Sequence, residues 1–84
     1  MQLYMDVHEQ LPKDAGAEEV AQAHRADLAT QDRYGVQYLQ YWVDETNGKA
    51  FCLVAAPNPD AAIAVHREAH GLVPDRIYPV VEGL

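Results

Sequence analysis

An Asn-Gly pair at positions 47–48 separates two runs rich in aromatic and β-branched residues, 36–46 and 49–56. Such residues favour strands. Asn-Gly is the preferred two-residue connection of a β-hairpin, because both positions tolerate a positive φ. We therefore predict an antiparallel hairpin over residues 36–56, and no other feature constrains the fold as strongly.

The segment before the hairpin predicts a strand and then a helix. Residues 3–9 alternate in polarity with a period of two, which is typical of a strand. Glu18 and Glu19 suit the first turn of a helix, where acidic side chains complement the dipole. Gly35 is placed to end that helix.

The segment after the hairpin predicts a second helix and a last strand. Asn58 is a candidate N-cap, and Pro59 suits the first helical position. Gly71 ends this helix. Residues 76–81 then form a strand, in which Pro79 indicates an edge position.

The order strand–helix–strand–strand–helix–strand predicts one ferredoxin-like α+β domain over residues 1–84, with two helices on one face of a four-stranded antiparallel sheet. On the face under the helices we expect Leu3, Met5, Val7, Leu39, Tyr41, Val43, Phe51 and Leu53. On the opposite face we expect Tyr4, Asp6, His8, Tyr38, Gln40, Trp42, Asp44, Cys52 and Tyr78. The second set is too aromatic for solvent and too polar for a core. We therefore predict that it packs in a homodimer of the α+β barrel type or lines a cavity.

Charge and composition exclude several functions. The formal net charge is −7, with 6 basic residues against 13 acidic ones. This balance argues against nucleic acid and anionic membranes as partners. One cysteine, Cys52, and no basic, apolar leader favour a cytoplasmic location. There is no serine and no phosphate-binding glycine loop, so the residues predict no enzyme.

Four histidines are the main chemical resource of the chain. His66 and His70 are four residues apart on the second helix, so their rings lie on one side and can hold one metal ion. The alternative is that His66 and His70 are surface residues without a function, because this spacing also arises by chance. His24 lies in the middle of the first helix's apolar face, and Asp27 is near enough to bond it. That placement is typical of a core histidine, with a ligand role as the alternative.

The end of the first strand gathers further candidate ligands. His8 lies beside Glu9 and shares a strand face with Asp6, whose carboxylate can orient the imidazole or join it as a ligand. Cys52 alternates onto the same face. It can act as a small buried hydrophobe or supply a soft thiolate.

Five blocks of sequence resemble the small nickel-binding proteins first described from Streptomyces. They are YMDVH at 4–8, AHRADL at 23–28, YWVDE at 41–45, FCLV at 51–54 and VHREAHGL at 65–72. The resemblance covers nearly the whole chain. It implies a ferredoxin-like fold, a homodimer, surface nickel sites and a role in nickel sequestration, without enzymatic activity. All four histidines, Asp6, Asp27 and Cys52 fall inside the blocks. Surface sites favour His66, His70 and His8 over His24.

Three hypotheses follow. The first is a nickel-binding protein whose histidines are helped by Asp6, Glu9 or Asp27, with an affinity that falls below a pH of about 6.5. The second is a small enzyme or ligand binder, similar to monooxygenases and isomerases. It works in the sheet cavity, with His8 as general base. The third is an interaction domain that binds metal only incidentally.

Overall fold

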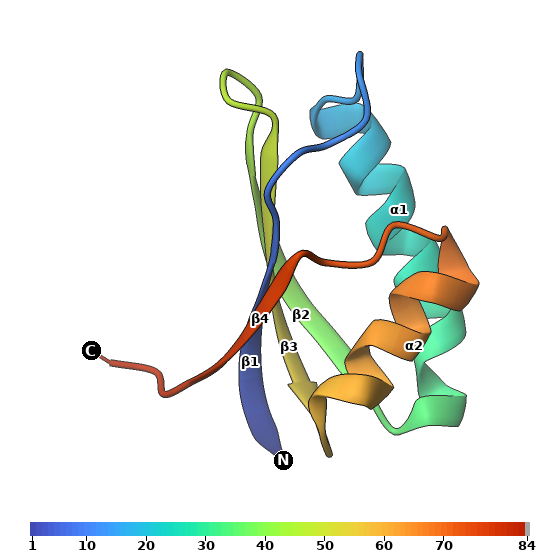
Figure 1. Cartoon of the computed structure of the whole chain (residues 1–84). Coiled ribbons are helices and arrows are strands. Elements are labelled where there is room, and N and C mark those ends of the chain that lie inside the picture. Colours follow the sequence, from blue (N-terminus) through green and yellow to red (C-terminus); the bar gives the residue numbers. More distant parts are fainter. Residues whose placement is uncertain (84) are drawn as a thin grey trace.

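The computed structural model describes residues 1–83. Its elements are β1 (Gln2–His8), α1 (Ala17–Thr30), the short 3-10 helix η1 (Gln31–Tyr34), β2 (Gln37–Asp44), β3 (Lys49–Ala56), α2 (Pro59–Ala69) and β4 (Arg76–Val80). The strands pair antiparallel in the order β2-β3-β1-β4. Both helices lie on one face of the sheet and leave the other face bare (Figure 1). The predicted ferredoxin-like fold is confirmed. Neither α-helix has the length and hydropathy that a membrane span needs.

The predicted helix signals act as expected. Asn58 Oδ1 accepts the backbone N–H of Ala61 at 2.8 Å, and Pro59 opens α2. The first helix continues into η1, which ends at Gly35 with a φ of 65°. Strand β4 lies at the sheet edge, so Pro79 removes no hydrogen bond that an inner strand needs.

The connection between β2 and β3 is longer than predicted. Asp44 pairs with Lys49, so the loop spans four residues, 45–48. Gly48 has a positive φ of 66°, whereas Asn47 does not. Asp44 Oδ1 instead accepts the backbone N–H of Asn47 at 3.1 Å. This side-chain bond stabilises a turn that does not require a positive φ at both central positions.

The two faces of the sheet are largely exchanged relative to the prediction. The helices bury five side chains expected on the other face: Tyr4, Asp6, His8, Tyr38 and Cys52. The bare face instead holds most of the apolar set, with a shallow groove lined by Leu3, Met5, Gln40, Trp42, Leu53, Val80, Val81 and Glu82. Alternation fixes which residues share a face, but it does not decide which face is covered.

A β-bulge at Leu39 explains why β2 follows the prediction only in part. Tyr38 pairs with Val54 and Gln40 with Leu53, which leaves Leu39 as an extra residue. The extra residue shifts the alternation by one position. Tyr41, three residues after Tyr38, therefore also faces the helices and packs against the core.

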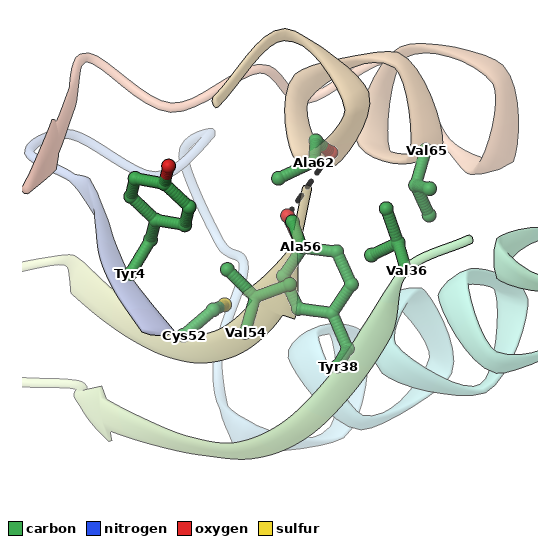
Figure 2. Close-up of a cluster of buried hydrophobic side chains, with 8 residues drawn as sticks. All are labelled: Tyr4, Val36, Tyr38, Cys52, Val54, Ala56, Ala62 and Val65. Carbon is green, nitrogen blue, oxygen red and sulfur yellow. Dashed lines mark hydrogen bonds between the residues drawn. The ribbon is translucent and has the colours of Figure 1, made fainter. Parts of the chain in front are cut away.

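The core combines large side chains from the sheet with small ones from α2 (Figure 2). Ala62 and Val65 of α2 pack against Tyr38 and Val54. The alanine lets the helix approach the sheet while the tyrosine ring fills the space between them. The Tyr38 hydroxyl lies 2.7 Å from Asp6 Oδ2 and 3.1 Å from the Ala62 carbonyl, so the two acceptors share its proton.

Candidate metal centre

His66 of α2 lies at the centre of a buried polar cluster between the helices and the sheet. Only 1% of its side chain is exposed. Its Nε2 is 3.0 Å from Asp6 Oδ2 of β1, and its Nδ1 is 2.9 Å from Asp27 Oδ1 of α1. One imidazole therefore joins two carboxylates that come from different elements.

The two carboxylates fix the charge of this ring. Burial disfavours the imidazolium, but hydrogen bonds to Asp27 and Asp6 outweigh burial and raise the pKa of His66 to about 11. Burial also opposes the ionised form of Asp6 and of Asp27, yet contacts with His66 hold both carboxyl pKa values below the usual range. Without metal, His66 is thus a buried cation between two anions.

His70 brings a third donor atom to the Asp27 side of the cluster. It is the C-cap residue of α2, where the backbone leaves helical geometry. Its Nε2 lies 3.0 Å from Asp27 Oδ1 and 3.1 Å from His66 Nδ1. With the 2.9 Å contact between His66 and Asp27, the three atoms form a nearly equilateral triangle. We call Asp27, His66 and His70 the outer group.

Protons alone cannot satisfy all three edges of this triangle. The backbone N–H of Leu72 donates to His70 Nδ1 at 3.1 Å, so a neutral His70 ring carries its proton on Nε2. If His66 Nδ1 is also protonated, two N–H groups oppose each other. If it is not, its lone pair opposes a carboxylate oxygen. A single cation removes this conflict within the triangle, because all three lone pairs can point toward it. His70 then carries its proton on Nδ1 and gives up the hydrogen bond from Leu72.

A second set of donors lies on the other side of His66. Asp6, His8, Cys52 and His66 are all buried, and they offer ligand atoms within 4.8 Å of one another. We call them the inner group. Asp6 Oδ1 has no hydrogen-bond partner among the described residues, although His8 Nε2 approaches it to 3.4 Å. Burial raises the pKa of the Cys52 thiol to about 11, so it is protonated in the absence of metal.

Every member of the two groups except Asp6 lines one cleft with an empty volume of about 450 Å³, its open mouth included. The walls are mostly apolar and come from Leu11, Ala15, Val20, Ala23, Tyr41 and Leu72. His24 lines the same cleft, with its ring centroid 4.8 Å from that of Tyr41. Burial lowers the pKa of His24. Within residues 1–83, His24 belongs to neither donor group.

The structure thus brings six of the eight predicted ligands together and leaves out His24 and Glu9. Glu9 points away, with Oε2 3.0 Å from Lys49 Nζ and Oε1 3.5 Å from Arg76 Nε. His66 and His8 are buried, so the expectation that they lie at the surface is wrong. Asp27 bonds His66 and His70 in place of His24.

Sequence reasoning missed one participant, Tyr38, which supports Asp6 through its hydroxyl group. A tyrosine in a strand carries no signal of that role. Its contact with Asp6 joins two strands that are not neighbours in the sheet.

Comparison with known proteins assigns the chain to a family. Residues 4–80 match the family described as nickel responsive protein SCO4226-like. The chain belongs to this family. A solved relative is SCO4226 from Streptomyces coelicolor A3(2), which is 33% identical. The match covers 98% of this chain and 99% of that chain, with a TM-score of 0.87. A search of curated proteins found no match.

Proposed function

We propose that the protein binds a nickel ion as cargo, through Asp27, His66 and His70, for sequestration or homeostasis of the metal. The observation that carries the proposal is the triangle of donor atoms, whose edges of 2.9, 3.0 and 3.1 Å cannot all be hydrogen bonds. Membership of a family described as nickel responsive supports the choice of ion.

The spacing of the outer group suits an ion that keeps further positions for water. With metal–ligand distances of about 2.0–2.1 Å, ligands at right angles lie about 2.8–3.0 Å apart, whereas tetrahedral ligands lie about 3.3–3.4 Å apart. The observed edges of 2.9, 3.0 and 3.1 Å are nearer to the first range. Two imidazoles and a carboxylate are donors that nickel accepts, and the remaining positions face the cleft.

The residues behind His66 support the same role. An ion on Nδ1 leaves the ring proton on Nε2, which donates to Asp6 Oδ2 at 3.0 Å. Asp6 in turn accepts from Tyr38. A carboxylate behind a metal-bound imidazole fixes the orientation of the ring and makes it a better ligand.

Calorimetric titration of the tag-free protein with nickel tests the proposal. His70→Ala removes one donor at the rim, where 13% of the side chain is exposed, so the core should stay intact. Loss of a residue behind a ligand costs about 10–100-fold in affinity. Loss of a ligand itself should therefore weaken nickel binding by at least about 100-fold.

His24→Ala is the matched control, because it removes an imidazole from the same cleft but from neither donor group. It should change nickel affinity by less than about threefold, far below the loss expected for a ligand. Equal losses in the two variants, or no nickel binding by the unaltered protein, would contradict the proposal.

We also propose that the bare face of the sheet binds a second copy of the chain. Leu39, Trp42 and Tyr78 are each 45–50% exposed. A domain of this size buries a small fraction of its surface, so covering these side chains adds stability.

We also propose a cytoplasmic location, because a free Cys52 persists in a reducing compartment.

The enzyme hypothesis placed His8 and Asp6 in a cavity on the bare face, whereas both side chains lie under the helices, where His8 lines the cleft. We propose a binding role for this cleft, because its polar groups form the two sets of candidate metal ligands.

A further inference from the structure

Three residues of the inner group, Asp6, His8 and Cys52, are not ligands of the proposed nickel site, whereas the fourth, His66, belongs to both groups. The inner group takes Asp6 and His8 from β1, Cys52 from β3 and His66 from α2. All four residues are buried, and their ligand atoms lie within 4.8 Å of one another. Asp6 Oδ1 is buried and has no hydrogen-bond partner among the described residues, with His8 Nε2 3.4 Å away. A buried carboxylate oxygen without a donor is costly, and a cation beside it removes that cost.

We propose that the inner group is a second metal site of the zinc type, and that it and the nickel site exclude each other because both need His66. This inference rests on the proposed function for the identity of the outer site. The inner site itself stands on its own four residues.

The two groups differ in the ions that they suit. The inner group offers four buried protein donors, among them one thiolate. Closed sites with four nitrogen, sulfur and oxygen ligands are typical of zinc, and a thiolate favours it further. The outer group offers three donors and an open side toward the cleft, which suits an ion that retains water.

The two sites exclude each other because they share the imidazole ring of His66. A neutral imidazole has one free lone pair, and its other nitrogen carries a proton. An ion on Nε2 leaves the Nδ1 proton to donate to Asp27, and an ion on Nδ1 leaves the Nε2 proton to donate to Asp6. Each arrangement places a carboxylate behind the metal-bound ring. Binding at the inner site releases one proton from Cys52 and one from His66 to solvent.

Cobalt is the probe for the inner site, because thiolate ligation to Co²⁺ gives a strong charge-transfer absorption in the near ultraviolet. We expect this band in the unaltered protein and in His70→Ala, which lacks the nickel site. Cys52→Ser keeps the size of the side chain and should lose the band. The band in His70→Ala tests the inner site even if nickel does not bind as proposed.

Native mass spectrometry with zinc and nickel together tests exclusion. We expect one ion per chain, and one equivalent of zinc should weaken apparent nickel affinity at least tenfold. In Cys52→Ser, zinc should lose that effect while nickel affinity without zinc stays within about threefold. Two ions per chain would overturn exclusion, and the absence of a thiolate band would overturn the site. Both readouts use the unaltered protein, so they decide the matter even if Cys52→Ser does not fold.

Discussion

Asp6 on the covered face of the sheet is fully buried, whereas Trp42 on the bare face is 45% exposed. The covered face also holds His8, Cys52 and Tyr38, which meet His66 and Asp27 from the helices. The bare face holds leucines, methionine and aromatic rings that meet no helix. Hydropathy alone predicts the opposite assignment.

The difference between the faces shows that polar side chains are buried where hydrogen-bond partners are available to them. Asp6 Oδ2 accepts from both Tyr38 and His66, and Asp27 Oδ1 lies within hydrogen-bond distance of His66 and His70. Polar groups satisfied in this way can be buried at an acceptable cost. Among residues 1–83 the bare face shows no such network, and its apolar side chains remain available for a partner.

The substitution Asp6→Ala on the covered face should cause the largest loss in the free energy of unfolding. Asp6→Ala leaves the buried His66 cation with one carboxylate fewer and the Tyr38 hydroxyl without its charged acceptor. Loss of one partner from a buried ion pair costs about 3–5 kcal/mol, which is a large part of the stability of a small domain. Urea unfolding measures the effect. Glu18→Ala, whose side chain is 74% exposed, should cost less than about 0.5 kcal/mol. A loss below about 1 kcal/mol for Asp6→Ala would show that the network is unimportant for stability.

A charge on the bare face should leave folding intact and prevent association. Trp42→Asp is expected to raise the dimer dissociation constant by at least about 30-fold, because a central aromatic residue contributes about 2 kcal/mol or more. Sedimentation equilibrium measures this change. Leu28→Asp is the control, since Leu28 is 44% exposed on α1 and Trp42 is 45% exposed on the sheet. A monomeric unaltered protein, or equal effects of the two variants, would remove the bare face as an interface.

A pair of tyrosine variants compares the faces directly. Tyr38→Phe deletes the hydroxyl that donates to Asp6 and should lower the free energy of unfolding by about 1–2 kcal/mol. Tyr78→Phe makes the same change on the bare face, where the side chain is 47% exposed, and should have almost no effect. Thermal unfolding of both variants provides the test, and the comparison fails if the two losses are equal.

A lower pH should weaken nickel binding on the covered face and leave dimer association through the bare face unchanged. Nickel displaces a proton from His66, whose pKa of about 11 lies above the whole neutral range. Nickel affinity should therefore fall as pH falls, by about tenfold or 1.4 kcal/mol for each unit between pH 8 and pH 6. The fall begins well above pH 6.5, because His66 does not titrate as a free histidine. Calorimetry across this range measures it, and dimer association measured in parallel should stay constant. A nickel affinity that is level down to pH 6.5 would show that His66 is not a ligand.

Local signals in the sequence were sufficient for the element order. The N-cap Asn58, the edge residue Pro79 and the terminating Gly35 each act within a few residues, so their effects can be predicted from local sequence. The candidate ligands could also be chosen from residue type, but their grouping could not, because Asp27 bonds His66 and His70 and not the predicted His24.

The assignment of the two faces was not predictable in the same way. Alternation in β1 permits either Leu3 and Met5 or Asp6 and His8 to face the helices. The choice depends on His66, which reaches Asp6 only after α2 packs on the sheet, and on Asp27 of α1, which bonds His66. The bulge at Leu39 has no turn or proline signal, and it changes the face of every later residue in β2.

The hydrogen bond from Leu72 to His70 links ion binding at His70 to the backbone of a residue that lines the cleft. An ion on His70 Nε2 leaves the ring's only proton on Nδ1, where it meets the backbone N–H of Leu72. The hydrogen bond between Leu72 and the His70 ring must then break, in the turn that begins at Gly71 with its φ of 83°. Leu72 lines the cleft, so we expect the backbone at this point of the cleft to shift when an ion binds.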